Sequence, residues 1–243
     1  DFDTINEVIT PLHAATQNVI GIGLAMPGVV DGNGLVKRST LLGWRNVDVR
    51  TPIERRFSLP VTVNNDATAA MFTERLFGKG GPNMMFVRLR RGVGGAVLLG
   101  DVPVFGENHA GGEIGHISLD PQGPPCACGK RGCLERLVSA TSLHARLQCS
   151  DERMRASILR EAGTYLGTAL SMPVGLLDLA DVCVYGQSDI VNDTLLSAAQ
   201  AQLDLLTGSS FHTRTIIRRC ECEGEITLRG EALSVLHDYL ENR

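Results

Sequence analysis

Apolar positions along the chain alternate between helical and strand spacings. Ile5, Val8, Ile9 and Leu12 repeat at helical intervals over residues 5–17, and Pro11 is expected to interrupt this first helix. Further helices are predicted at 52–57, 67–77, 151–179, 193–206 and 230–240. Strands are predicted at 19–26, 59–63, 84–89, 96–99, 182–185 and 215–218. This alternation of strands and helices indicates an α/β protein with two lobes.

Glycine and proline mark the boundaries that we expect between the parts of the chain. The segment 78–82, Gly-Lys-Gly-Gly-Pro, is typical of a linker. We therefore expect an N-terminal α/β lobe over residues 1–82, a C-terminal α/β lobe over residues 83–229, and a closing helix over residues 230–243. A loop rich in cysteine and glycine, residues 116–133, belongs to the second lobe.

Two strand ends place turn-forming or polar residues where α/β sheets bind ligands. Pro27 and Gly28 follow the strand at 19–26, and Asn65 and Asp66 follow the strand at 59–63. Open α/β sheets bind ligands outside the carboxyl ends of their strands. Asp66 also lies at the start of a predicted helix, where Asn and Asp are favoured N-caps. The spacing alone is consistent with a cap or with a functional carboxylate.

Composition narrows the possible classes of function without choosing one. Hydrophobic residues make up 43% and charged residues 21% of the 243 positions, as is ordinary for a globular protein, and the formal net charge is −4. This charge balance does not indicate the positively charged surface that nucleic-acid binding requires. No apolar run has the length of a membrane span and no signal peptide opens the sequence, so we expect no membrane partner.

Three cysteines and a histidine fall close together in the polar loop. His116 is followed after nine residues by Cys126, after one more by Cys128 and after four more by Cys133. Cys3His is a standard ligand set for structural zinc, and the glycines of the loop free the backbone to turn the thiolates inward. The alternative is that three buried cysteines and a satisfied histidine form part of a core. Three thiols crowded in a polar loop favour zinc.

The other cysteines are Cys149, Cys183, Cys220 and Cys222, scattered through the second half of the chain. Their scatter and the odd total indicate a reducing, cytoplasmic environment without a disulfide framework. Cys220-x-Cys222 has the form of a second metal-binding fragment, but no neighbour in the sequence completes it. We therefore interpret these four residues as plain thiols.

The residues around the cysteine loop resemble the signature of the ROK family (repressors, open reading frames and sugar kinases). The matching motif is Glu113-x-x-His116 followed by Cys126-x-Cys128-Gly-x-x-Gly-Cys133-x-Glu135. The resemblance extends from about residue 27 to about residue 143, and more weakly to the C-terminus. It implies a two-lobed ribonuclease H-like fold of the actin-like or hexokinase-like ATPase type, with a small zinc-binding loop and a sugar bound in the cleft between the lobes.

The resemblance also implies roles for individual residues. Asn65-Asp66-Ala matches the family's Asn-Asp-Ala motif, whose aspartate is the catalytic base of the kinases, while Glu113, His116 and Glu135 match positions that contact the ring hydroxyls of the sugar. A sugar-binding set of these five residues is chemically reasonable, because carboxylate, amide and imidazole groups exchange hydrogen bonds with neighbouring hydroxyls. His116 would bind structural zinc through one ring nitrogen and donate to the sugar through the other.

On the nucleotide side, the sequence departs from the family's kinases at three places. The kinases use an N-terminal Asp-x-Gly-Gly-Thr hairpin, which has no counterpart here. Their second phosphate loop begins Gly-Thr, which Arg90-Arg91 replace ahead of the matching Gly92-Val-Gly-Gly, and a later Gly-Gly pair becomes Gly186-Gln187. Two large side chains would crowd a loop whose backbone must approach phosphate closely.

We therefore expect the effector-binding part of a ROK-type transcriptional regulator. It would respond to a sugar, amino sugar or sugar phosphate, and it would act on DNA through an N-terminal winged helix-turn-helix that lies upstream of Asp1, outside this sequence. A homodimer or a dimer of dimers in the cytoplasm is implied. The alternative is an ATP-dependent sugar kinase with Asp66 as general base. Zinc-dependent hydrolysis ranks third, because protein ligands fill all four positions on the metal.

Overall fold

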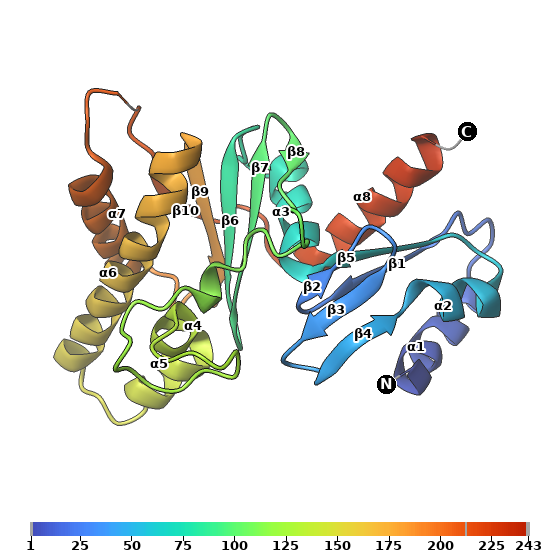
Figure 1. Ribbon diagram of the computed structural model, residues 1–243, viewed down its shortest axis with the longest axis horizontal. Coiled ribbons are helices and arrows are strands. Elements are labelled where there is room, and N and C mark those ends of the chain that lie inside the picture. Colours follow the sequence, from blue (N-terminus) through green and yellow to red (C-terminus); the bar gives the residue numbers. More distant parts are fainter. Residues whose placement is uncertain (1, 212, 242–243) are drawn as a thin grey trace. The chain divides into compact units, whose positions relative to one another are not determined.

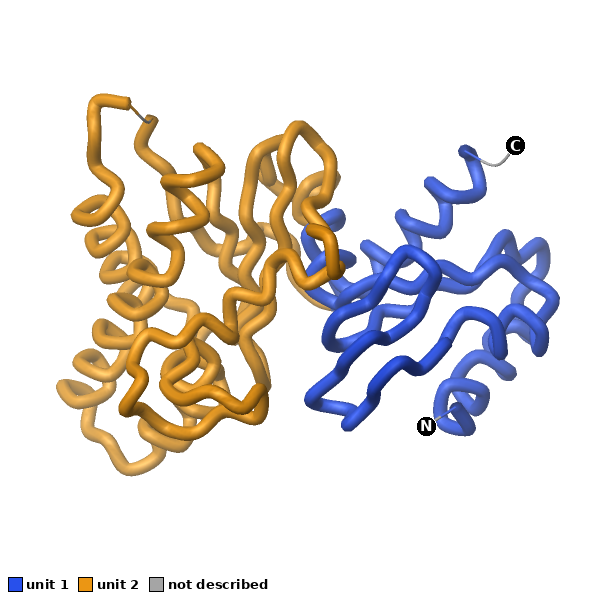
Figure 2. Tube along the Cα trace, viewed as in Figure 1, with its two compact units in different colours: residues 1–73, 225–243 blue, residues 74–224 orange. Residues whose placement is uncertain are grey.

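The structure is a computed structural model that describes residues 2–211 and 213–241. The chain divides into two compact units, residues 1–73 with 225–243 and residues 74–224 (Figure 2). We call them unit 1 and unit 2. The sequence placed the limits at 82 and 229 and treated 230–243 as a separate closing helix. In the structure that helix belongs to unit 1 and packs against two of its strands.

Unit 1 combines a parallel strand pair with a small antiparallel sheet (Figure 1). The parallel pair is β1–β5, and the antiparallel order is β2-β3-β4. Its elements are α1 (Phe2–Ala15), β1 (Ile22–Met26), β2 (Val29–Val30), β3 (Leu35–Ser39), β4 (Trp44–Asp48), α2 (Arg50–Phe57), β5 (Val61–Asn65), α3 (Asp66–Phe77, which continues into unit 2) and α8 (Ile226–Glu241). The core is apolar throughout: Ile9, Met26, Val30, Val36, Val49, Ile53, Val61 and Val63.

Helix α8 approaches its neighbours closely at two successive residues. A side chain at Gly230 would collide with the carbonyl of Ala69 on α3, so only glycine allows this crossing. The next residue, Glu231, is 2% exposed and accepts hydrogen bonds from the backbone N–H of Asn64 (3.0 Å) and from its side-chain amide (2.8 Å). Strand β5, which ends at Asn65, is therefore held by hydrogen bonds to helix α8.

Unit 2 is built on one five-stranded mixed sheet in the order β10-β9-β6-β7-β8. The strands β6, β9 and β10 run parallel to one another. Strand β7 pairs antiparallel with β6, and β8 pairs antiparallel with β7. Helices α6 and α7 cover one face of this sheet (Figure 1). The elements are β6 (Met84–Leu89), β7 (Val93–Leu99), β8 (Val102–Pro103), the short 3-10 helix η1 (Ile114–His116), α4 (Leu134–Val138), α5 (Ala140–Leu147), α6 (Glu152–Leu177), β9 (Asp181–Gly186), α7 (Asp193–Thr207) and β10 (Ile216–Arg219).

Glycine residues allow α6 and α7 to pack unusually closely. Side chains added at Gly163 and Gly167 would collide with backbone carbonyls of α7 at Leu195 and Ala199. The α6 helix continues through Pro173, and Asp151 caps its start by accepting the N–H of Met154 at 2.8 Å. No helix in the described ranges is both long and apolar enough to cross a bilayer.

Several local predictions were wrong in detail. Pro11 lies inside α1 without interrupting it. Gly94 and Gly95, expected in a loop, belong to β7 and pair with Arg88 and Val87. The turn between β6 and β7 is therefore only Arg90–Gly92. Gly95 in β7 is needed for packing, since a side chain there would press on the carbonyl of Gly112 at 2.6 Å.

Candidate functional site

The predicted metal ligands lie on one folded loop of unit 2. His116 ends η1, Cys126 and Cys128 lie in a tight turn, and Cys133 immediately precedes α4. The turn is closed by hydrogen bonds from Cys126 N–H to the Lys130 carbonyl (2.8 Å) and from Gly129 N–H to the Cys126 carbonyl (3.0 Å). Gly132 has a positive φ of 56° and no room for a side chain beside Asp120, so glycine is required there.

Geometry brings the four predicted ligands together as one group, which we call the His116 cluster. The ligand atoms of His116, Cys126, Cys128 and Cys133 all lie within 4.8 Å of one another. The Nδ1 atom of His116 is 3.6 Å from the Cys126 sulfur, and the sulfurs of Cys128 and Cys133 are also 3.6 Å apart. Tetrahedral zinc with Zn–S bonds of about 2.3 Å places two sulfurs about 3.8 Å apart. The residues therefore fit a tetrahedral metal ion.

The thiols of this cluster influence one another's protonation. Burial and the neighbouring thiols of Cys128 and Cys126 raise the pKa of Cys133 to about 12. Burial also disfavours the thiolate of Cys128, but hydrogen bonds from the Lys130 backbone and from the two other thiols outweigh it and lower the pKa of that residue. Without a metal, the surroundings therefore favour the thiolate of Cys128 over that of Cys133. A bound divalent cation would stabilise all three, because thiolates are its ligands.

The second ring nitrogen of His116 points toward a carboxylate. Its Nε2 atom is 3.8 Å from Oε2 of Glu113, three residues earlier. Metal-binding histidines commonly turn the other ring nitrogen to a carboxylate, a carbonyl or water, which fixes the ring. His116 and Glu113 therefore form one polar group beside the cluster, as the sequence motif implied.

Glu135, the third predicted carbohydrate residue of unit 2, lies against the turn between β6 and β7. Its Oε2 atom accepts a hydrogen bond from the backbone N–H of Val93 at 3.2 Å. A side chain at Gly92 would press on the same oxygen, so the Glu135 carboxylate would have to move away from the turn. The Glu135 carboxylate thus lies against one side of the glycine-rich turn between β6 and β7.

Asn65 and Asp66, the remaining predicted site residues, lie in unit 1 where β5 meets α3. The side-chain oxygen of Asn65 accepts the N–H groups of Ala67 (2.8 Å) and Thr68 (3.2 Å), and its amide donates to the Gly28 carbonyl (2.9 Å). Asn65 therefore caps α3 and holds the Pro27–Gly28 loop. The cap that the sequence offered to Asp66 belongs to Asn65.

A second group of metal-ligand residue types was not recognised from the sequence. Ligand atoms of Glu74, Cys183 and Cys220, all buried, lie within 4.8 Å of one another, and we call them the Glu74 cluster. The Glu74 carboxylate accepts from the Cys220 thiol (3.0 Å) and from the N–H groups of Glu221 and Cys222 (both 3.1 Å). The only signal in the sequence was Cys220-x-Cys222, because its partners come from distant segments.

Arg218 neutralises the negative charge of the Glu74 carboxylate. Arg218 donates to Oε1 of Glu74 at 2.6 Å and to both carboxylate oxygens of Asp181 at 2.8 and 2.9 Å. These interactions lower the pKa of Glu74 although burial opposes its charge. The thiol of Cys183 has a raised pKa, owing to its hydrogen bond with Cys220 and to burial. A saturated carboxylate, a fixed cation and a Cys183 thiol with a raised pKa do not suit a metal ion.

Most of the chain matches one protein family. The model of the ROK family matches residues 2–170. The chain belongs to the ROK family. A xylose repressor of Bacillus subtilis is 31% identical over 154 residues, which are 63% of this chain but only 40% of the repressor. A glucokinase of Halalkalibacterium halodurans is 37% identical over 254 aligned residues, covering 88% of this chain and 77% of the enzyme.

Solved structures of ROK proteins share the fold. A transcriptional regulator homologous to the E. coli MLC protein superposes with a TM-score of 0.83 at 24% identity, covering 98% of this chain and 68% of the other. A glucokinase from Streptomyces griseus, solved with glucose and AMPPNP, gives 0.82 at 23% identity, covering 97% and 88%. The predicted hexokinase-like, actin-like fold is thereby confirmed. The zinc ion stays a prediction, supported by the fit of the His116 cluster.

Both branches of the ROK family are represented among these relatives. Repressors and glucokinases match at similar identity, 31% and 37%, so kinship does not decide between a regulator and a kinase. The choice must come from the chemistry of the site residues in this chain.

Proposed function

We propose that this chain is the effector-binding part of a sugar-responsive ROK transcriptional regulator. The observation that carries the proposal is the turn between β6 and β7. A phosphate-binding loop needs backbone N–H groups open to phosphate oxygens. In this turn the N–H of Val93 already donates to Glu135, and the two residues before Gly92 are arginines. A carboxylate in contact with the turn repels a phosphate group placed there.

The proposed effector is a sugar, amino sugar or sugar phosphate held by hydrogen bonds. Asp66, Glu113, His116 and Glu135 supply the carboxylate and imidazole groups by their match to the family motif. Asn65 supports them by holding the Pro27–Gly28 loop and the start of α3. In the proposal zinc in the His116 cluster is structural, because its four protein ligands leave no open position for substrate.

In the proposed regulator, the effector acts by favouring one conformation over another. A ligand shifts such an equilibrium only by its difference in affinity for the two states. DNA would be bound by a helix-turn-helix outside this sequence, and a dimer would couple two such elements. The resemblance to the xylose repressor and to the MLC homologue supports this role.

A kinase is the second candidate, and two observations favour it. The Halalkalibacterium glucokinase matches a larger share of this chain than the Bacillus repressor does. In addition, Asn65 provides the cap of α3, so Asp66 is not needed for that role. In this alternative Asp66 is the general base for the attacking sugar hydroxyl.

Phosphorylation separates the two candidates. The chain is incubated with Mg²⁺, ATP and a panel of xylose, glucose and N-acetylglucosamine, and binding of the same sugars is measured by calorimetry. The regulator proposal expects binding of at least one sugar without any sugar phosphate. Turnover that disappears in Asp66→Asn while sugar binding persists would establish the kinase instead.

A second test concerns the carbohydrate residues. Glu113→Ala is expected to weaken sugar binding at least tenfold, since a charge-assisted hydrogen bond contributes about 1.5–3 kcal/mol. Glu107→Ala, which removes an exposed acid from a neighbouring loop, serves as the matched control and should bind sugar normally. Equal affinity in the two variants would contradict the assignment of Glu113.

A further inference from the structure

A buried carboxyl group in unit 1 lies against the strand that leads to Asn65 and Asp66. Glu231 of α8 is 2% exposed. Its Oε1 atom accepts the backbone N–H of Asn64 at 3.0 Å, and its Oε2 atom accepts the side-chain amide of Asn64 at 2.8 Å. Asn64 directly precedes Asn65 and Asp66 in the sequence. Glu231 therefore holds the residue next to two members of the proposed sugar-binding set.

Close packing fixes the helix backbone that carries Glu231. A side chain at Gly230 would collide with the Ala69 carbonyl on α3. A side chain at Gly23 in β1 would press on the Cβ atom and on the carbonyl oxygen of Glu231, both at 3.1 Å. Helix α8 thus has little room to move at this level, so a change in the hydrogen bonding of the carboxyl group is passed to Asn64.

The surroundings of Glu231 offer no compensating positive charge. Strands β1 and β5 contain no titratable side chain, and Asp66 is the titratable residue of α3 within unit 1. On α8, Arg229 and His237 are exposed, and no cation among residues 2–211 and 213–241 pairs with Glu231. Burial, with a smaller contribution from Asp238, raises the pKa of Glu231 to about 7 against its two hydrogen bonds. Both protonation states are therefore populated near neutral pH.

The two protonation states of Glu231 bind Asn64 differently. The carboxylate accepts two N–H groups, as observed. The neutral acid carries an O–H group that must donate, and the side-chain carbonyl of Asn64 becomes its acceptor when the amide turns by half a rotation. Protonation thus reverses the direction of one hydrogen bond and removes a buried charge that has no partner cation.

We propose that Glu231 is a positioning residue that makes ligand binding at Asn65 and Asp66 respond to pH near neutrality. The proposal rests on the sugar-binding role proposed above for these two residues. Neutral Glu231 holds the end of β5 against α8 without a buried charge. Ionisation places an unpaired charge in that contact and loosens it. Affinity for the sugar is therefore highest while Glu231 is protonated, and it falls as the pH rises through about 7.

The first test needs no sugar. The backbone N–H groups of Ala67 and Thr68 donate to the side chain of Asn65, so their amide NMR signals report on this junction. Between about pH 6 and pH 8 these signals should shift in the wild type with a midpoint near 7. They should not shift in this way in Glu231→Gln, which keeps the volume and both hydrogen bonds without titrating. Signals that do not titrate, or that titrate equally in both proteins, overturn the proposal.

The second test measures sugar binding over the same pH range, by calorimetry with xylose, glucose and N-acetylglucosamine. From pH 6 to pH 8 the wild-type affinity should fall at least about fivefold more than that of Glu231→Gln. Glu231→Ala should bind weakly at every pH, because Asn64 loses its partner. Parallel profiles for the wild type and Glu231→Gln overturn the proposal. If no sugar binds while the amide signals still titrate, the sugar-binding function fails and the coupling of Glu231 to the junction stands.

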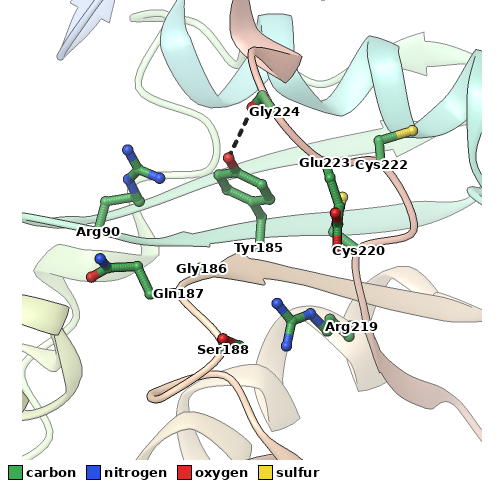
Figure 3. A pocket seen from close by; sticks show the side chains of 10 residues that line it. All are labelled: Arg90, Tyr185, Gly186, Gln187, Ser188, Arg219, Cys220, Cys222, Glu223 and Gly224. Atoms are coloured by element: carbon green, nitrogen blue, oxygen red, sulfur yellow. Dashed lines mark hydrogen bonds between the residues drawn. The ribbon is translucent and has the colours of Figure 1, made fainter.

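Two control variants each remove a hydrogen bond without altering Glu231. Thr62→Val removes the other bond between β5 and α8, from the Thr62 hydroxyl to the Asp238 carboxylate at 2.7 Å. Tyr185 lines a separate pocket of unit 2, where its hydroxyl donates to the Gly224 carbonyl at 3.1 Å, and Tyr185→Phe removes this bond (Figure 3). Both variants should keep the wild-type pH profile, and its loss in either contradicts the assignment to Glu231. Thermal unfolding verifies that every variant is folded.

Discussion

Two cysteine-bearing clusters lie in unit 2, and only one of them suits a metal ion. The His116 cluster and the Glu74 cluster each bring ligand-type atoms within 4.8 Å of one another. In the first, the sulfurs contact each other and the imidazole, and the Cys133 thiol also contacts the His116 carbonyl at 3.7 Å. In the second, the carboxylate is already bonded to a thiol, to backbone N–H groups and to Arg218.

The difference shows that proximity of ligand-type residues does not define a metal site. A cation needs lone pairs that are not committed elsewhere, and it is repelled by a fixed positive charge. Arg218 supplies that positive charge in the Glu74 cluster, so this cluster is complete without a metal. The predictions below test this contrast, beginning with the largest effect.

Removing Glu74 should damage the protein most. Glu74→Ala leaves a buried thiol and three backbone N–H groups without their acceptor and removes one partner of Arg218, at a cost of about 3–5 kcal/mol. Chemical unfolding measures the loss. Metal content should stay at the wild-type value, and a fall in metal content would show that the two clusters are not independent.

Breaking the His116 cluster should remove the metal. Cys133→Ser is expected to abolish binding of about one zinc ion per chain, measured by elemental analysis, and to destabilise the protein by roughly 2–4 kcal/mol through loss of a structural metal. Cys183→Ser is the matched control from the other cluster. Metal lost equally from both variants would contradict the contrast.

The two buried glutamates should give opposite pH dependence. Glu74 has a lowered pKa, so its stabilising interactions are present at neutral pH and are lost as the pH falls below about 4.5. Burial raises the pKa of Glu231 to about 7, with Asp238 adding to the effect against hydrogen bonds from Asn64. The folded state then binds its proton more tightly than the unfolded state. Its contribution to stability therefore falls as the pH rises from about 4.5 to about 7.

A variant isolates the Glu231 contribution. Between pH 5 and 8 the wild type should lose roughly 2–3 kcal/mol more than Glu231→Gln, because glutamine keeps the volume and has no titratable proton. Denaturant midpoints across this range provide the measurement. Parallel pH profiles for the two proteins would show that Glu231 does not titrate there.

The smallest effect is expected at Cys220. Cys220→Ser keeps a donor to Glu74 and should change stability by less than about 1 kcal/mol, whereas Cys220→Ala removes the donor and should cost about 1–2 kcal/mol. A serine variant less stable than the alanine variant would indicate that packing of the sulfur, and not its hydrogen bond, matters at this position.

Local sequence patterns predicted most elements but not their ends. The helix over 151–179 and the strand over 182–185 follow from long apolar periodicity, and they appear as α6 and β9. Caps were less certain because two adjacent polar residues compete for one position. Asn192, the residue before the predicted helix start at 193, accepts the Leu195 N–H at the start of α7, and Asn65 rather than Asp66 caps α3.

The His116 cluster was predictable because its ligands lie close together in the sequence. The Glu74 cluster was not predictable, because its residues come from α3, β9 and the segment after β10. These segments lie far apart in the sequence, and only the fold brings them together. The same holds for the Glu135–Val93 hydrogen bond, which joins a motif residue to a turn that seemed unrelated in the sequence. The roles proposed for Asp66, Glu113, His116 and Glu135 in sugar binding stay predictions.

Unit 1 draws its strands from the beginning of the sequence and its packing helix α8 from the end. During synthesis on the ribosome, β1 and β5 emerge long before Glu231 and the apolar residues of α8 are made. Unit 2, which is continuous, can complete its folding first, since all its contacts are already available. Until α8 has been made, the β1–β5 surface that it later covers is exposed.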